Sequence, residues 1–230
     1  MNKILPNDLN QKNLVIITSV INTSPNKLSY TKTRSIYTHA ERFNQTCKTI
    51  ESIKKHIPNS YIILLECGKL NPKYQQIFNT SCNKVINYIN NKQISDIIHK
   101  SLYKGYAESK VIRTFLTEYD ISFFNSLYKI SGRYTLNSNF NYQYYDNTFN
   151  CFKYITNHNI TEGVHTSTVF YKITNGYFLI YKKALKSYKQ KLLKGVAIEK
   201  LISIAIPNIK IVDSLGVEGT VAVNGLFISY

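Results

Sequence analysis

A glycine and two cations lie close together near the end of a short apolar run, within residues 125–137. Residues 125–131 have strand character, Lys129 lies inside that run, and Gly132 and Arg133 follow it. In an open α/β sheet, ligands bind beyond the carboxyl ends of the strands, and a guanidinium matches the geometry of phosphate. The segment therefore predicts a site for an anionic ligand. The alternative is a strand and a turn, with Gly132 present for its backbone freedom and Arg133 in solvent.

The chain before this segment alternates between strand and helix patterns. Fully apolar runs are typical of strands buried in a parallel sheet, and Thr38 with Glu41 fits a helix capping box. We expect strands over residues 14–21, 61–66, 84–89 and 125–131, and helices from Thr38 to Pro58, from Pro72, and over 95–103 and 105–118. Such alternation predicts a parallel sheet with right-handed crossovers.

The second half of the chain has a different pattern, because apolar and polar residues alternate in its strands. We expect these half-buried strands over residues 148–155 and 164–173, helices over 177–193 and 197–205, and a last strand over 209–213. The sequence shows no internal repeat and no low-complexity linker. We predict a single α/β domain with a mixed sheet flanked by helices.

The charge balance favours polyanionic partners. The chain has 230 residues, a hydrophobic content of 43%, a charged content of 18% and a net charge of +16, which together describe a globular basic protein. The cations are spread along the chain, and no zinc-finger or RNA-recognition signature occurs, so we expect no dedicated nucleic-acid partner. Part of the lysine excess also fits the composition that an AT-rich genome produces.

The cysteines and the apolar runs indicate a reducing compartment and no membrane span. The spacing of the four cysteines suits neither zinc nor a disulfide framework. Residues 1–12 lack a hydrophobic signal region, and no run approaches the ~20 apolar residues of a transmembrane helix. We expect a soluble, cytoplasmic protein with reduced thiols.

The layout resembles the GT-A fold of nucleotide-sugar-dependent glycosyltransferases, and within it a group of small glycosyltransferase-like proteins of bacteria and large DNA viruses. The residues that carry the resemblance are Thr18-Ser19, Arg34-Ser35, the stretch 41–46, Leu65-Glu66 and the stretch 129–134. The resemblance implies a nucleotide-binding half over about residues 13–135 and an acceptor half over about 136–230. It covers most of the chain.

One departure from that fold concerns the metal. Most GT-A enzymes carry Asp-x-Asp after the fourth strand, where two carboxylates hold Mn²⁺ or Mg²⁺ on the diphosphate. This chain has Ser131-Gly132-Arg133 at that place and no Asp-x-Asp anywhere. We therefore expect no metal and no cofactor beyond the donor, with Lys129, Arg133 and Arg34 neutralising the diphosphate.

Further residues of the nucleotide half are candidates for donor binding. Thr18 and Ser19 end the first strand, and Arg34 precedes the first helix, where a phosphate would also gain from the helix dipole. Arg42 lies off the apolar stripe of that helix, and Glu66 ends a buried strand where it would accept hydrogen bonds from a base or ribose. The alternatives are ordinary strand-end hydroxyls, solvent-facing arginines and a Glu66 paired with a nearby lysine.

An inverting enzyme of this kind needs a carboxylate or imidazole to deprotonate the acceptor hydroxyl. The candidates are Glu199, Glu218, Glu162 and His165. Glu199 comes first, because the resemblance implies an acid near the acceptor at the start of the helix after Gly195; the alternative is a favourable charge in a first helical turn.

The sequence thus predicts a glycosyltransferase that transfers a sugar from a nucleotide-diphosphate sugar to a glycan, a lipid-linked acceptor or another hydroxyl acceptor. For a viral protein, the compartment would be the host cytoplasm. The alternative is a catalytically inactive relative or a basic protein that binds nucleic acid or another polyanion.

Overall fold

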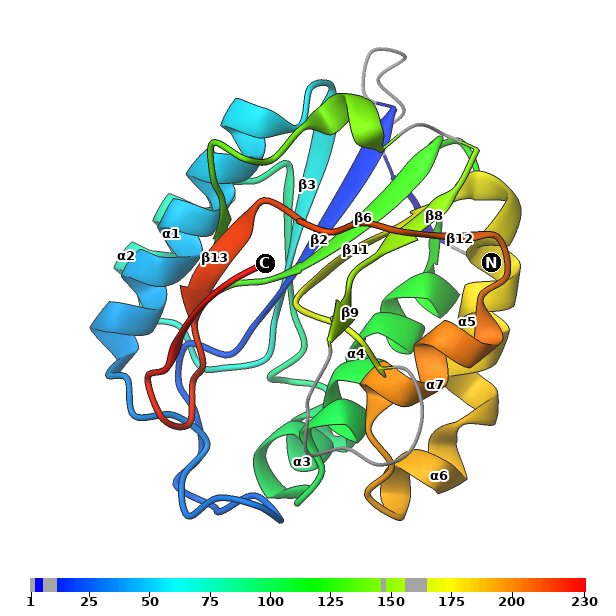
Figure 1. Cartoon of the computed structure of the whole chain (residues 1–230). Coiled ribbons are helices and arrows are strands. Elements are labelled where there is room, and N and C mark those ends of the chain that lie inside the picture. Colours follow the sequence, from blue (N-terminus) through cyan, green and yellow to red (C-terminus); the bar gives the residue numbers. More distant parts are fainter. Residues whose placement is uncertain (1–2, 6–11, 146–147, 156–164) are drawn as a thin grey trace.

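The structure, a computed structural model, describes residues 3–5, 12–145, 148–155 and 165–230. One mixed sheet forms its centre, with the strand order β12–β8–β11–β6–β2–β3–β4 (Figure 1). The strands are β2 (Asn13–Ser19), β3 (Ser60–Glu66), β4 (Lys84–Asn87), β6 (Ser126–Ser131), β8 (Asn150–Phe152), β11 (Phe170–Thr174) and β12 (Ile209–Ile211). This architecture confirms the predicted fold class, a mixed α/β sheet flanked by helices in a single domain.

The sheet has a parallel part from the first half of the chain and mixed strand directions in the second, as the sequence predicts. Strands β4, β3, β2 and β6 are parallel, whereas β11 runs antiparallel to both β6 and β8. In the parallel part, Ser19 pairs with Glu66, and Thr18 pairs with Ser131. The carboxyl ends of β2, β3 and β6 therefore meet at one edge of the sheet.

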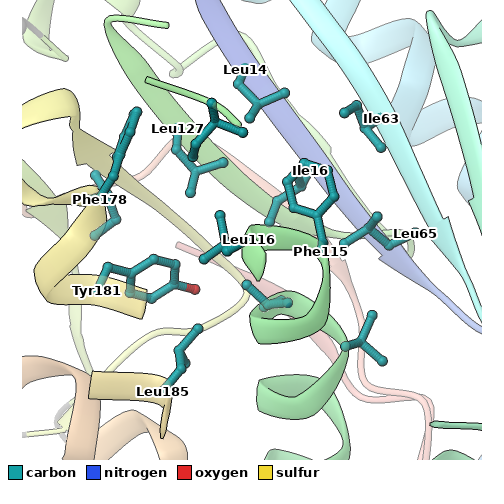
Figure 2. Packing of buried hydrophobic residues seen from close by; sticks show 14 of the residues in the cluster. Leu14, Ile16, Ile63, Leu65, Phe115, Leu116, Leu127, Phe178, Tyr181 and Leu185 are labelled. Atoms are coloured by element: carbon teal, nitrogen blue, oxygen red, sulfur yellow. The ribbon is translucent and has the colours of Figure 1, made fainter. Parts of the chain in front are cut away.

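Helices cover both faces of the sheet. They are α1 (His39–His56), α2 (Pro72–Ser81), α3 (Lys92–Lys100), α4 (Lys104–Glu118), α5 (Phe178–Ser187), α6 (Lys189–Leu193) and α7 (Ile198–Ala205), with 3₁₀ turns η1 (Tyr142–Tyr144) and η2 (Asn175–Tyr177). Alternate residues of β2 serve the two faces: Leu14 and Ile16 pack towards α4 and α5, whereas Val15 and Ile17 pack towards α1. Figure 2 shows the layer that contains Leu14 and Ile16. Burial on both faces explains the continuous apolar run.

Local signals start α1 and α2 where the sequence predicts. Glu41 Oε2 accepts a hydrogen bond of 2.7 Å from the backbone N–H of Thr38, and Thr38 Oγ1 accepts one of 3.3 Å from the N–H of Glu41, which completes the capping box. Asn71 caps α2, with Pro72 at its first position. Asn91 caps α3, so that helix begins three residues earlier than predicted.

The second half is more broken than predicted. The strand expected over 164–173 splits into β10 (His165–Thr166) and β11, and the helix expected over 177–193 breaks at Tyr188 into α5 and α6. A second sheet joins β7 (Tyr134–Leu136), β13 (Val217–Thr220) and β14 (Phe227–Ser229); further short strands are β1 (Lys3–Ile4), β5 (Tyr119–Asp120) and β9 (Tyr154–Ile155). These strands have two to four residues, which is too short to show a period.

All four cysteines are free thiols, and three of them are buried. Among the helices that the structure describes, none has both the length and the apolar character needed to cross a bilayer.

Candidate functional site

Two adjoining hollows open beside the carboxyl ends of β2 and β6. The first has a volume of about 110 Å³ and lies among Thr18, Ser19, the loop after β2 and the helices α3 and α4. The second has a volume of about 430 Å³ and lies among α4, the stretch 167–169 and the loop before α7. Both hollows are lined by Lys104, Glu108, Ser131 and Arg133. They are therefore two halves of one cleft.

Arginine is concentrated in the first hollow. The chain has four arginines, and three of them line this hollow: Arg34, Arg42 and Arg133. The Nε atoms of Arg34 and Arg133 are buried and have no hydrogen-bond partner. Unpartnered buried donors are costly, so these guanidinium groups are suited to an anionic ligand that would accept their hydrogen bonds.

Arg42 reaches the hollow from the buried side of α1. Its Nε donates a hydrogen bond of 2.6 Å to the carbonyl of Val20, and its Nη1 donates one of 3.1 Å to Ser35 Oγ. Burial and the nearby charge of Arg133 lower its pKa, yet a guanidinium stays protonated at neutral pH. Arg42 therefore braces the loop after β2 and adds a fixed positive charge to the wall.

The sequence predicts Arg34 near the amino-terminal end of α1, but its guanidinium contacts the carboxyl end of α3. Its guanidinium donates to the carbonyls of Ile98, at 3.1 Å, and Ser101, at the carboxyl end of α3. The last carbonyls of a helix lack partners within the helix, so this contact both caps α3 and fixes the arginine in the wall of the hollow.

The ammonium of Lys129 is bound by groups of the protein itself. It is fully buried in β6, forms an ion pair with Glu108 of α4, and donates to Ser131 Oγ at 2.9 Å and to the carbonyl of Thr168 at 2.5 Å. Its three N–H donors are thus engaged with the protein, because three elements meet around them. Lys129 holds α4, β6 and the stretch before β11 together at the junction of the two hollows.

Sequence reasoning missed Glu108, the carboxylate in that junction. Burial acts to raise its pKa, but the charges of Lys129, Lys104 and Arg133 hold the pKa of Glu108 below its ordinary value. A signal was present: Lys104 and Glu108 occupy the same helix face as the buried Val111 and Phe115, at a spacing of four and three residues. Charged groups on a face that must be buried need partners.

Lys104 adds a titratable cation to both hollows. Lys104 is exposed to solvent within the cleft, and the walls of the two hollows partly desolvate its ammonium. This desolvation and the charges of Arg133 and Lys129 lower the pKa of Lys104 to about 8. Among the described residues that line the cleft, the positively charged side chains therefore outnumber the carboxylates.

Glu199 is the carboxylate of the second hollow. It lies in the first turn of α7, and its Oε1 accepts a hydrogen bond of 2.7 Å from Thr168 Oγ1. The backbone carbonyl of Glu199 accepts a second bond, of 3.0 Å, from Thr166 Oγ1. The stretch that Lys129 holds through the Thr168 carbonyl is therefore the one that also orients Glu199.

Of the other three candidate bases, only Glu218 lies fully within the described residues, and it does not line either hollow. Glu218 lies on β13 and accepts a hydrogen bond of 3.0 Å from Asn137 Nδ2. Glu162 lies outside the described residues. The backbone of His165 belongs to β10, and its side chain lies outside the described part.

Tyrosines dominate the remaining wall of the second hollow. They are Tyr30, Tyr103, Tyr106, Tyr134 and Tyr230. The pKa of Tyr30 depends on charges in both hollows. Burial and Glu199 raise this pKa, whereas Arg133 and Arg34 lower it. Aromatic faces with polar tips suit a ligand that has apolar C–H faces and hydroxyl groups.

The remaining predicted donor-site residues have structural contacts. Glu66 is fully buried and does not line either hollow; its Oε1 accepts hydrogen bonds from the N–H groups of Ile21, at 2.9 Å, and Gly68, at 2.7 Å. Burial raises the pKa of Glu66, and these bonds oppose the rise. Gly132 allows close packing, because a Cβ there would lie 3.0 Å from Thr46 Oγ1.

Metal-ligating side chains do not cluster in the described part of the chain. No group of three or more His, Cys, Asp or Glu residues there is arranged to hold an ion.

Solved structures with a similar fold include two with a TM-score above one half. Core-mannan synthase A (CmsA/Ktr4) from Aspergillus fumigatus has a TM-score of 0.55 and 7% identity, over 87% of this chain and 72% of that one. The bifunctional glycosyltransferase WbbM has a TM-score of 0.54 and 9% identity, over 92% of this chain and 40% of that one. The glycosyltransferase GlyE of Streptococcus pneumoniae TIGR4 has a TM-score of 0.48 and 11% identity, over 88% and 45%.

The chain shares its fold with these glycosyltransferases. The fold is shared without sequence similarity, since no protein-family model and no curated protein matches the sequence. The chain also spans less than half the length of GlyE and of WbbM.

Proposed function

We propose that this protein transfers a sugar from a nucleotide-diphosphate sugar to a hydroxyl acceptor, without a metal ion. The observation that carries the proposal is the convergence of three of the four arginines on the hollow beside β2 and β6. A lysine-rich composition supplies lysine everywhere, but it does not gather arginine at one place. Arg34, Arg42 and Arg133, with Lys104, are the groups that would bind and neutralise the diphosphate.

The residues at the usual metal position do not fit a divalent ion. Ser131 is the last residue of β6, Gly132 and Arg133 follow it, and the nearby carboxylate of Glu108 is already paired with Lys129. CmsA was solved in a form with Mn and GDP. Positive side chains at this position would stabilise the charge that develops on the leaving diphosphate.

The second hollow supplies an acid and a sugar-compatible wall for the acceptor. In a direct displacement, the bond between the anomeric carbon and the diphosphate oxygen breaks, and the electron pair leaves with the diphosphate. The acceptor oxygen bonds to the anomeric carbon and gives its proton to Glu199, which Thr168 holds in place. Lys129 and Glu108 act on this step as positioning residues, because they fix Thr168 and the shared wall.

The donor half is tested by melting temperature with a panel of nucleoside diphosphates and nucleotide sugars, in the presence of EDTA. We expect at least one compound to raise the melting temperature, with no effect of EDTA, and Arg133→Ala to abolish that shift. Arg113→Ala is the matched control, since Arg113 is the one arginine that does not line the first hollow. No shift from any compound would refute the proposal.

The acceptor half is tested by the release of nucleoside diphosphate from the donor that binds. We expect Glu199→Gln to retain the nucleotide-induced melting shift but to lose turnover by a factor of about 10²–10⁴, the usual contribution of a general base. Unchanged turnover in Glu199→Gln would assign the proton to another group.

A further inference from the structure

A lysine-rich surface covers α5, α6 and the residue after them. Six lysines occur between Phe178 and Lys194, and the sequence has no aspartate or glutamate between Glu162 and Glu199. We call these six the α5–α6 lysines: Lys182, Lys183, Lys186, Lys189, Lys191 and Lys194. Five of them are exposed and Lys182 is half-buried. Neither of the two ion pairs found within the described residues involves them.

Apolar side chains are exposed among these lysines. Leu179 is 62% exposed, and Ile180 and Leu193 are each 38% exposed. Leu179, Lys183 and Lys186 are spaced by four and three residues, so they lie on one face of α5. The opposite face carries Phe178, Tyr181, Ala184 and Leu185, which are buried in the core. The outer face is therefore both basic and apolar.

The positive surface continues onto α4. Lys110 is partly buried, and its pKa is lowered by desolvation and by the charges of Arg113 and Lys189. Like charges from two helices thus lie within electrostatic reach of each other. A surface with this much uncompensated charge has a strong attraction for a polyanion.

We infer that the α5–α6 surface docks this protein on an anionic membrane. Lysines at a membrane surface are attracted by anionic headgroups, while exposed leucine and isoleucine side chains enter the boundary between headgroups and acyl chains. Charge complementarity and the apolar residues between the lysines together favour this occupant. A nucleic acid would gain from the lysines, but it offers no apolar layer for Leu179, Ile180 and Leu193.

The position of the surface connects it to the cleft. Figure 1 shows α6 and the loop after β2 at the same end of the molecule. Leu192 and Val196, which line the second hollow, flank Lys194 in the chain. If the proposed transfer activity holds, docking brings the second hollow close to the membrane, and the acceptor would be a lipid-linked one.

The test is flotation of the full chain with vesicles of phosphatidylcholine alone and with about one third phosphatidylserine. We expect binding only to the anionic vesicles. The variant Lys183→Gln/Lys186→Gln/Lys189→Gln should lose roughly 100-fold in affinity, since each lysine near the surface contributes about fivefold. The matched control is Lys48→Gln/Lys54→Gln/Lys55→Gln, which removes the same charge from the exposed face of α1 and should lose a few-fold at most. Unchanged melting temperatures establish that both variants are folded.

Two further measurements separate a membrane from other polyanions. Leu179→Ser/Leu193→Ser should weaken vesicle binding and leave affinity for a mixed-sequence DNA duplex unchanged. Equal losses in the two lysine variants, or vesicle binding that the serine variant does not reduce, would overturn the inference. No arm contains a nucleotide, so failure here is independent of failure of the proposed transfer activity.

Discussion

At the scale of single residues, the junction of the two hollows depends on one buried ion pair. Lys129 has no exposed surface, and the Glu108 side chain is 14% exposed. The desolvation of two such charges is repaid only while both partners and their hydrogen bonds are present. Removing one partner leaves the other buried and uncompensated.

Glu108→Gln should therefore destabilise the protein by about 3 kcal/mol at neutral pH. Asp96→Asn is the matched control: it removes the exposed pair between Asp96 and Lys100 and should cost no more than about 0.5 kcal/mol. Urea denaturation of the three proteins measures both values. Equal losses for the two variants would show that the Lys129–Glu108 pair contributes no more than a surface pair.

The stability difference between the wild type and Glu108→Gln should also depend on pH. The folded pKa of Glu108 is held below its ordinary value of 4.5, so its contribution is complete above pH 4.5 and is lost as the pH falls through the folded pKa. The stability difference between the wild type and Glu108→Gln should shrink over that acidic range.

At the scale of elements, the approach of α1 to the sheet fixes the edge of the first hollow. Thr46 of α1 donates a hydrogen bond of 2.9 Å to the carbonyl of Gly132 and lies 3.4 Å from Ser19 Oγ. The N–H of Gly132 donates to the carbonyl of Thr18 at 3.0 Å. Helix α1 can come this close because residue 132 has no side chain. This is a packing requirement and not one of backbone freedom, since Gly132 is not among the glycines with positive φ.

Gly132→Ala should lower stability by about 1 kcal/mol, because the new Cβ would lie 3.0 Å from Thr46 Oγ1 and 3.3 Å from Ile17 Cγ2. Gly176→Ala is the control, since a Cβ at this position meets nothing within 4 Å. That variant should gain a few tenths of a kcal/mol from the reduced entropy of the unfolded chain. Thermal unfolding should thus show shifts of opposite sign, and a stabilised Gly132→Ala would contradict the packing argument.

At the scale of the whole molecule, the net charge of +16 is a destabilising feature that the fold only partly offsets. Two ion pairs occur among the described residues, and the cleft and the α5–α6 surface each gather cations. Self-repulsion of this kind acts over a distance set by the ionic strength. The concentration of positive charge in two such regions therefore costs the protein stability.

The melting temperature should therefore rise by a few degrees as sodium chloride increases from about 10 mM to about 150 mM, over which the Debye length falls from about 30 Å to about 8 Å. Choline chloride at the same concentrations should give the same rise, because screening does not depend on the identity of the cation. A flat or falling melting temperature would show that self-repulsion is not a significant cost.

Much of the fold could be predicted from local patterns. The apolar runs of β2 and β3, the Thr38–Glu41 capping box and Pro72 each act within a few residues, so they place elements before any tertiary contact forms. The short strands β7, β13 and β14 could not be predicted, because none is long enough to show a period and because β7 pairs with β13 across about eighty positions. The break at Tyr188 also has no clear local signal.

The sequence by itself determined the alternating α/β order and the position of Ser131-Gly132-Arg133 after the fourth strand of the parallel part. Only the tertiary structure decided which side chains meet there. It brought Arg34, Arg42 and Arg133 to one hollow, paired Lys129 with Glu108 and joined Thr168 to Glu199. The reason is physical: periodicity and capping are set by neighbours in the chain, whereas the partner of a buried charge depends on strand register and on crossovers that span twenty or more residues.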